Sequence, residues 1–199
     1  MPGITVIPVG AVPDGIPETV ARFLEAATSL PTTVDPDPID PAFAYDRTRG
    51  QMDCRKLLPA LQERATARGT YVLGLADVDL FSAIFTFVFG EAHLGGTAGL
   101  FSIHRLRPEL YGLPLDPELL IARARREALH ETGHLLGLVH CRTPECAMQF
   151  SGSAEEVDLK NDRLCTECRA RVESRLGASD SGLREKPRGE IPPGNPSGS

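Results

Sequence analysis

The sequence is poor in the features that mark membrane proteins and nucleic-acid-binding proteins. It contains no tryptophan, and only 6% of its 199 residues are aromatic. No apolar run approaches the length of about 18 residues that a membrane-spanning helix requires. Lysine and arginine total 21 against 27 acidic residues, a net charge of -6, whereas contact with nucleic-acid phosphates requires a basic face. We therefore predict neither a membrane nor a nucleic-acid partner.

A secretory signal is also lacking. Residues 1–15 have no basic segment followed by a long apolar run, and Pro8 and Pro13 interrupt them. We therefore expect a cytoplasmic protein, in which thiols stay reduced and clustered cysteines more often hold a metal than form disulfides. Export of a chain whose signal has been removed is the alternative.

Length and composition suit a single soluble domain. With 41% hydrophobic residues, the chain is long enough to bury a sizeable core. We expect one domain over residues 1–173, and we expect it to act as a monomer. From residue 177 onward Ser, Gly, Pro and charged residues dominate, a composition typical of disordered segments. We therefore predict a flexible tail over residues 174–199.

Strand and helix signals alternate along much of the chain. Short β-branched runs predict strands, apolar residues at helical spacing predict helices, and proline-rich stretches predict loops. We expect strands at 4–9 and 70–77, a hairpin of strands 84–92 and 98–106 joined through 93–96, helices at 17–30, 54–68 and 117–137, and a loop over 35–51. The last helix begins with a typical N-cap and first turn at Asp116, Pro117 and Glu118.

The stretch HETGHLLGLVH, residues 130–140, carries the clearest chemistry. His130 and His134 lie four residues apart on the expected helix, so both imidazoles reach one ion, and Glu131 between them can accept a proton. Gly137 suits a left-handed helix end, which would turn the chain and bring His140 back as a third ligand. HETGH alone could match by chance, but the full pattern predicts a three-histidine metal site with an open fourth position.

The cysteines predict a second metal site. Two close pairs of thiolates suit a closed tetrahedral zinc site, and the alternatives are two disulfides or unrelated buried thiols. The pairs are Cys141 with Cys146 and Cys165 with Cys168. Since Cys141 directly follows His140, a zinc held by the cysteines would anchor the loop that delivers the third histidine. We interpret the fifth cysteine, Cys54, as a small buried residue.

These motifs together resemble the archaemetzincins, a branch of the metzincin zinc metallopeptidases. The resemblance rests on the long metzincin motif with a cysteine directly after its third histidine, then CAM at 146–148 and CTEC at 165–168. Upstream stretches are also similar to this family: TRGQ at 48–51, ADVDL at 76–80, FTFVFGEA at 85–92 and SIHRLRPELYG at 102–112. The resemblance thus covers nearly all of residues 4–172.

The resemblance implies a fold and a set of residue roles. The fold would be a compact metzincin-like α/β (α+β) domain, with a twisted mixed β-sheet, helices, and a cleft at the active-site helix that carries HETGH. One catalytic domain would span residues 1–173 and include a four-cysteine zinc module over 141–168. Two zinc ions per chain are implied, of which the catalytic one is the more labile. The implied roles are His130, His134 and His140 for the catalytic zinc, Glu131 as general base, Met148 as the Met-turn methionine under the metal, and Cys141, Cys146, Cys165 and Cys168 for the structural zinc.

The sequence departs from the metzincin pattern after the Met-turn. Some metzincins have a tyrosine two residues after that methionine, but here Phe150 stands there and offers no hydroxyl. The group that helps zinc stabilise the oxyanion is therefore unassigned. His104 and Tyr111 are candidates, although a structural role is favoured for both. Asp77 and Asp79 suggest turn caps rather than a cation site.

The leading functional hypothesis is a zinc-dependent peptidase that acts on peptide or protein substrates. Glu131 would take a proton from the attacking water and return it to the leaving amine. The hairpin over 84–106 would offer an exposed strand edge to which an extended peptide adds as a further strand. The alternative is a zinc-stabilised peptide- or protein-binding module with little or no hydrolytic activity, which would not need Glu131.

Overall fold

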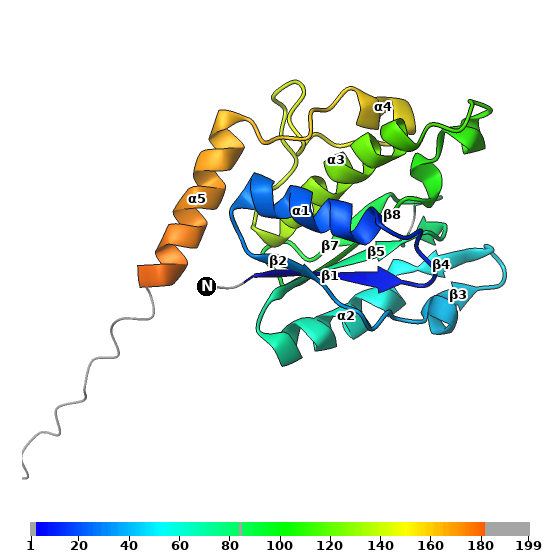
Figure 1. Ribbon diagram of the computed structural model, residues 1–199, viewed down its shortest axis with the longest axis horizontal. Coiled ribbons are helices and arrows are strands. Elements are labelled where there is room, and N and C mark those ends of the chain that lie inside the picture. Colours follow the sequence, from blue (N-terminus) through cyan, green and yellow to red (C-terminus); the bar gives the residue numbers. More distant parts are fainter. Residues whose placement is uncertain (1–2, 84, 182–199) are drawn as a thin grey trace, which may run out of the picture.

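The centre of the molecule is a five-stranded mixed sheet. The computed structural model describes residues 3–83 and 85–181 (Figure 1). Strand order is β2-β1-β5-β8-β7, with all neighbours parallel except β7, which runs antiparallel to β8 at the edge. The strands are β1 (Ile4–Val9), β2 (Thr32–Val34), β5 (Tyr71–Ala76), β7 (Gly90–Ala92) and β8 (Ala98–Ser102). The expected α/β class with a mixed sheet is confirmed.

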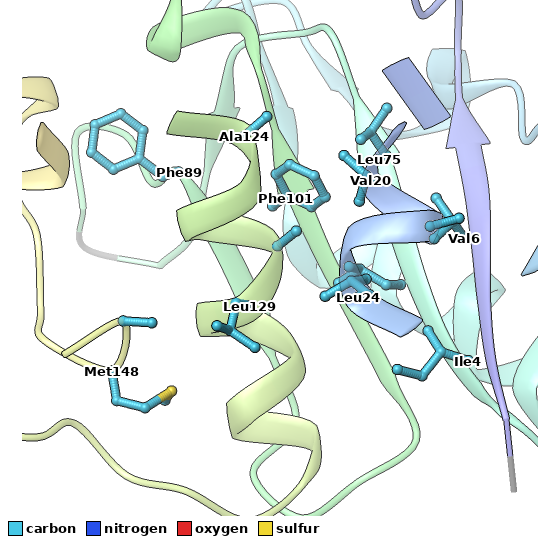
Figure 2. Packing of buried hydrophobic residues seen from close by; sticks show 14 of the residues in the cluster. Ile4, Val6, Val20, Leu24, Leu75, Phe89, Phe101, Ala124, Leu129 and Met148 are labelled. Carbon is cyan, nitrogen blue, oxygen red and sulfur yellow. The ribbon is translucent and has the colours of Figure 1, made fainter. Parts of the chain in front are cut away.

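Helices cover both faces of this sheet (Figure 1). Along β1, Ile4 and Val6 face one hydrophobic cluster while Ile7 and Val9 face the other, because successive side chains point to opposite faces. The first cluster lies under α1 (Ile16–Thr28) and α3 (Pro117–Leu135), and the second lies under α2 (Cys54–Arg68). Figure 2 shows Phe101 of β8 packed between the residues of α1 and α3.

A second, smaller sheet lies at one end of the domain. It consists of β3 (Tyr45–Asp46), β4 (Gln51–Asp53) and β6 (Leu80–Phe81), in the order β3-β4-β6. The remaining elements are the 3-10 helices η1 (Pro41–Ala44), η2 (His104–Leu106) and η3 (Pro108–Tyr111) and the helices α4 (Ala154–Asp158) and α5 (Thr166–Ser181). No helix within residues 3–83 and 85–181 is long and apolar enough to span a membrane.

Several expected elements are confirmed, and α3 begins for the expected reason. The strand at 4–9 and the helix at 54–68 have the expected bounds. The Asp116 carboxylate accepts a hydrogen bond from the backbone N–H of Leu119 at 2.9 Å, which caps the helix start. The helix ends at Leu135 rather than at 137 because Gly137, at φ 84°, already has a left-handed conformation.

The hairpin is shorter than expected, and two other segments differ. Residues 85–89 form a loop and not a strand, because side chains bond the Phe85 and Thr86 carbonyls, and regular pairing with β8 starts only at the Phe89 carbonyl, which accepts from the Ser102 backbone. Residue 84 lies outside the described residues. The expected loop over 35–51 contains η1 and β3, and β2 was not expected. Of the tail expected over 174–199, residues 174–181 are helical in α5, and the rest lies outside the described residues.

Candidate metal centres

The three histidines of HETGHLLGLVH converge on one point. His130 and His134 lie one turn apart on α3 with their Nε2 atoms 3.1 Å apart, and one ring nitrogen of His140 lies within 4.8 Å of a ring nitrogen of each. The Nδ1 atoms of His130 and His134 each lie 2.8 Å from a backbone carbonyl, of Ala147 and Leu138 respectively. A carbonyl only accepts, so each Nδ1 carries the proton and each Nε2 presents its lone pair to a metal.

A tight turn at the end of α3 returns the chain toward the helical histidines. Gly137 donates its backbone N–H to the His134 carbonyl at 2.9 Å, and Leu138 donates to the Gly133 carbonyl at 2.8 Å. A side chain at Gly137 would collide with the guanidinium of Arg175 on α5. The left-handed conformation is the reason this turn favours glycine, as its place in the motif predicts, and a larger residue would also displace the Arg175 guanidinium.

Burial controls the protonation of this site. It lowers the pKa of His130 well below its usual value and lowers the pKa of His134 and His140 as well, and the charge of Lys160 acts in the same direction. Neutral imidazole is the form that binds a metal ion. The surroundings therefore keep all three rings ready to coordinate at neutral pH.

Glu131 is enclosed beside the histidines. Its side chain is 4% exposed, and its Oε2 atom has no hydrogen-bond partner among the described residues. Burial raises the pKa of Glu131 well above its usual value, and the nearby charge of Glu127 raises it further. A Cβ atom at Gly90 of β7 would lie 2.6 Å from Oε1. Gly90 thus provides the space that the carboxylate occupies, a role that no sequence motif indicated.

Met148 packs against α3 near the histidines (Figure 2). Its side chain is fully buried, and a Cβ atom at Gly133 would collide with its sulfur atom. Gly133 occupies a variable position of the metzincin motif, so sequence reasoning missed it. Only a residue without a side chain leaves room for Met148 at this turn of the helix.

A buried ion pair links α3 to the segment that follows Met148. The Lys160 ammonium donates to Glu127 Oε1 at 2.7 Å and to the Gln149 carbonyl at 3.3 Å, and both charged side chains are almost completely buried. Glu127 lies about one turn before His130 and, like the histidines, lines the cavity described below. Sequence reasoning missed this pair because Lys160 follows a short polar helix and resembles an ordinary surface lysine.

Four clustered cysteines form a second candidate centre. The sulfur atoms of Cys141, Cys146, Cys165 and Cys168 all lie within 4.8 Å of one another, and every cysteine is free. Cys141 and Cys165 are 3.9 Å apart, whereas a disulfide requires about 2.05 Å. A hydrogen bond from the backbone of Cys168 is the main cause that lowers the pKa of Cys165 to about 7, which favours the thiolate that a metal needs. The fifth cysteine, Cys54, is fully buried in α2, as expected, and burial raises its pKa.

The weaker candidates lie away from this centre. Neither His104 nor Tyr111 lines the cavity beside the histidines. The Tyr111 hydroxyl donates to the Arg105 carbonyl at 2.7 Å. Asp77 and Asp79 form ion pairs with Arg107 and Arg105. The expected structural interpretation of these residues is therefore favoured over a catalytic or cation-binding one.

A cleft opens beside the histidines. A cavity of about 600 Å³ is lined by the three histidines and Glu131, by the edge strand β7, by the phenylalanines of residues 85–89 and by Phe150. The ring of Phe150 lies against His140 at 5.4 Å between centroids. Among the described strands β7 pairs only with β8, so its other edge remains open beside the cleft.

Comparison with known proteins identifies the family. The model of Peptidase family M54 matches residues 26–174. The archaemetzincin of Pyrococcus furiosus is 39% identical over 186 residues, which cover 87% of this chain and 94% of that protein. The archaemetzincin of Methanocaldococcus jannaschii is 44% identical over 138 residues, 68% of this chain and 73% of that protein.

A solved structure agrees with this assignment. The crystal structure of a zinc-dependent peptidase from Methanocorpusculum labreanum superimposes with a TM-score of 0.78 at 30% identity, and the match covers 85% of this chain and all of that one. Sequence, fold and the two groups of candidate metal ligands point the same way. The chain belongs to the archaemetzincin family and is a zinc metallopeptidase.

Proposed function

We propose that the chain hydrolyses peptide bonds with a zinc ion held by His130, His134 and His140 and with Glu131 as general base. The observation that carries this proposal is the orientation of the helical imidazoles. Two backbone carbonyls accept hydrogen bonds from the Nδ1 groups, so both Nε2 atoms turn toward His140 and, together with one ring nitrogen of His140, would supply three of the four donors of a tetrahedral site. The donor set therefore suits zinc with one open position.

Zinc bound there would polarise the scissile carbonyl and make the attacking water more acidic. Glu131 would take the proton of that water and deliver it to the leaving amine. Its raised pKa supports this role, because a carboxylate deprived of solvent accepts a proton more readily than an exposed one. Met148 would support the metal site from below by filling the space against Gly133.

The edge of β7 would bind the substrate backbone. On either side of β7, Phe89 and His93 direct their backbone groups toward β8: the Phe89 carbonyl accepts from the Ser102 backbone, and the His93 backbone donates to the Ala98 carbonyl. Antiparallel ladders alternate, so the backbone groups of Gly90 and Ala92 point to the open edge. An extended peptide could pair with these groups as an added strand and lie across the histidines.

A second zinc ion would be held by Cys141, Cys146, Cys165 and Cys168, which gives two ions per chain. Because Cys141 follows His140 directly, this ion would fix the loop that carries the third histidine. Residues 1–173, including the module over 141–168, would then form one catalytic domain. The clustering of the four sulfur atoms supports this assignment.

The test is cleavage of a mixed peptide library, read by mass spectrometry with zinc supplied. Glu131→Gln should lower kcat/KM by about 10²–10⁴-fold, the usual contribution of a general base, while zinc stays bound. Glu155→Gln, which changes an exposed carboxylate on α4, serves as the matched control and should retain activity. Undiminished cleavage by a zinc-loaded Glu131→Gln protein would exclude the role proposed for Glu131.

A further inference from the structure

One side of the cleft is an aromatic wall, formed by Phe85, Phe87 and Phe89 in the loop before β7. All three line the cavity together with the histidines. The rings of Phe87 and Phe89 contact edge to face at 5.3 Å between centroids, and Phe85 is 51% exposed. Phe150 and Val139, which are also largely exposed, line the same cavity. Exposed apolar surface of this kind beside a reactive centre is suited to cover an apolar ligand group.

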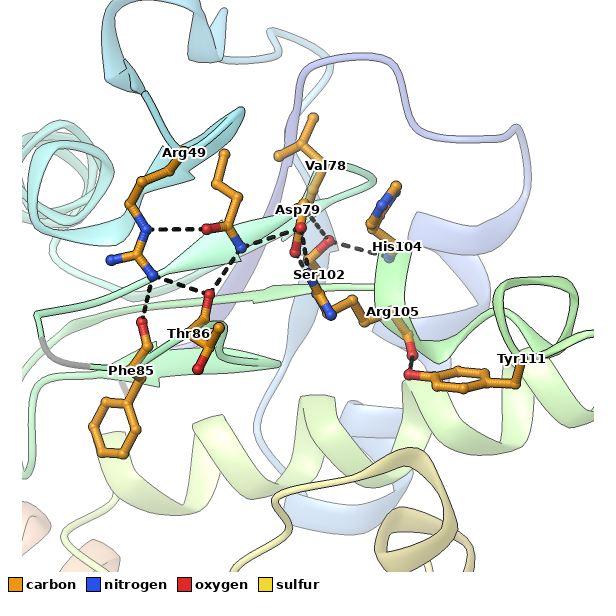
Figure 3. Close-up of polar contacts among 10 residues, drawn as sticks. Arg49, Val78, Asp79, Phe85, Thr86, Ser102, His104, Arg105 and Tyr111 are labelled. Carbon is orange, nitrogen blue, oxygen red and sulfur yellow. Dashed lines mark hydrogen bonds and ion pairs between the residues drawn. The ribbon is translucent and has the colours of Figure 1, made fainter. Parts of the chain in front are cut away.

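The start of the wall is held by side chains of β4 and of the turn between β3 and β4 (Figure 3). Arg49 Nη2 donates to the Phe85 carbonyl at 2.7 Å and to the Thr86 carbonyl at 3.1 Å. Gln51 Nε2 also donates to the Thr86 carbonyl, at 3.0 Å. Backbone bonds hold the end of the wall, from Val88 to the Leu80 carbonyl and from Ser102 to the Phe89 carbonyl. The position of its start, around Phe85, therefore depends on Arg49 and Gln51.

The two residues belong to a larger polar network. Arg49 Nε donates to Gln51 Oε1 at 3.1 Å, and its guanidinium lies 4.1 Å from the centroid of the Phe81 ring. Asp79 accepts from Gln51 at 3.1 Å and pairs with Arg105, whose guanidinium lies 4.2 Å from the Phe87 ring centroid. None of the four polar residues lines the cavity. The network therefore fixes the wall without contacting a ligand in the cleft.

The turn that leads into the wall needs such support. Ala83 has φ 45°, in the left-handed region that side-chain-bearing residues enter at a cost in free energy. A turn of this kind persists where surrounding contacts hold it. The bonds from Arg49 to the Phe85 and Thr86 carbonyls supply such contacts from outside the loop.

We infer that the cleft selects peptides with a large apolar side chain, of the size of phenylalanine, beside the scissile bond, and that Arg49 is a positioning residue for this preference. The inference rests on the proposed function, because it places the scissile bond at the three histidines. The wall supplies the apolar contact, and Arg49 keeps it at a fixed distance from the histidines. Loss of Arg49 should therefore weaken binding of large side chains and spare small ones.

The test compares two peptide hydroxamates that differ only in carrying Phe or Ala beside the chelating group. Each is titrated into the full-length, zinc-loaded protein by calorimetry. The unmodified protein should bind the Phe compound at least about tenfold more tightly than the Ala compound, because burying a phenyl ring contributes at least about this factor to affinity. In Arg49→Gln this ratio should fall to about twofold or less, with the Kd of the Ala compound changed by less than about twofold.

Matched variants separate positioning from general damage. Arg64→Gln removes an arginine that pairs with Asp35 at 3.0 Å, away from the cleft, and should keep the full ratio. Phe85→Ala changes an exposed ring and should lower the ratio directly. If Arg49→Gln does not fold, Arg49→Lys provides the test, because lysine retains the charge but cannot reproduce the planar contacts of the guanidinium.

Each outcome has a distinct meaning. An equal loss of affinity for both compounds in Arg49→Gln, an unchanged ratio in that folded variant, or a ratio near one in the unmodified protein overturns the inference. A Phe preference that depends on Arg49, in a protein that cleaves no peptide, supports the inference and contradicts the proposed hydrolysis. Failure of both hydroxamates to bind the zinc-loaded protein overturns the inference together with the assignment of zinc to the histidines.

Discussion

Gly133 shows how one residue position limits the packing of the candidate catalytic centre. It lies on α3 between His130 and His134, where any side chain would enter the space of the Met148 sulfur atom. Met148 is itself fully buried, so its side chain cannot move into solvent without disturbing its packing neighbours. The position of the Met148 side chain therefore depends on the absence of a side chain at Gly133.

We expect Gly133→Ala to destabilise the protein by about 1–3 kcal/mol, the usual cost of overpacking a core. Chemical denaturation of the zinc-loaded protein measures the change. In the double variant Gly133→Ala/Met148→Ala the methyl group at position 133 gains space. The destabilisation of the double variant should therefore be smaller than the sum of the destabilisations of the two single variants. Additive losses would show that the two side chains do not compete for this space.

The protonation of the three histidines is also set at the level of single residues, by the burial of each side chain. Burial lowers their pKa values, so the folded chain keeps them neutral at pH values where an exposed histidine, with a pKa of 6.5, takes up a proton. Stability that comes from this neutral form is present above the unfolded pKa and is lost as the pH falls toward the folded values. The same neutral form binds zinc.

We therefore predict that the affinity of the histidine site for zinc is independent of pH down to about 6.5, the ordinary histidine value, and falls only below it. Competition with a chelator of known affinity, at a series of pH values, measures this profile. A decline that already begins well above pH 6.5 would mean that the imidazoles titrate as exposed groups and that burial does not protect them.

At the scale of elements, β7 is the short edge strand on which substrate binding is proposed to depend. It has three residues, and β8 is its only partner among the strands that the structure describes. Strand β8 holds β7 by a ladder of backbone hydrogen bonds. In the loop before β7, the Phe85 and Thr86 carbonyls accept instead from the side chains of Arg49 and Gln51. The strand thus carries the open backbone groups and the loop carries the apolar contacts.

Pairing with this edge predicts that substrates lose affinity when their own backbone donors are blocked. Methylation of a single peptide nitrogen that pairs with β7 should raise KM by about 5- to 30-fold, the effect of losing about 1–2 kcal/mol, with a smaller change in kcat. A scan of one cleaved peptide, methylated at successive nitrogens, provides the measurement. Sensitivity should alternate along the peptide, and a uniform response would argue against strand addition.

At the scale of the whole molecule, the two candidate metal centres are neighbours along the chain and are also connected through α5. His140 and Cys141 are adjacent, and α5 begins at Thr166 between Cys165 and Cys168. Farther along α5, Arg175 donates to the Gly95 carbonyl at 3.1 Å, and the Gly95 backbone donates to the His134 carbonyl at 2.8 Å. The cysteine cluster is thereby connected to the histidine site by the chain and by a second route through the hairpin.

We predict that Cys146→Ser, which removes one proposed ligand of the structural zinc, also weakens zinc binding at the histidines by about 10- to 100-fold, the usual effect of losing support around a metal site. Elemental analysis should show loss of the structural ion, and chelator competition measures the remaining site. Cys54→Ser, at a buried cysteine outside the cluster, is the control and should keep both ions. An unchanged histidine site in Cys146→Ser would show that the two centres are independent.

Local signals in the sequence determined the elements and the ligand candidates. HETGHLLGLVH predicts two histidines on one helix face and a glycine turn, because helical spacing and the left-handed preference of glycine act over a few residues. Asp116 and Pro117 likewise predict the start of α3 from local bonding alone. The family resemblance was carried by the same short motifs and is shown by the match over residues 26–174.

Only the tertiary structure decided which distant residues share the site. The space at Gly90 for Glu131, the pair of Glu127 with Lys160, and the bonds from Arg49 to the aromatic wall join segments that are 33 to 41 residues apart. The phenylalanine-rich run at 85–89 shows the limit most clearly. Its composition predicts a strand, but whether a backbone forms a ladder or bonds side chains depends on what lies beside it, and chain folding alone determines that neighbour.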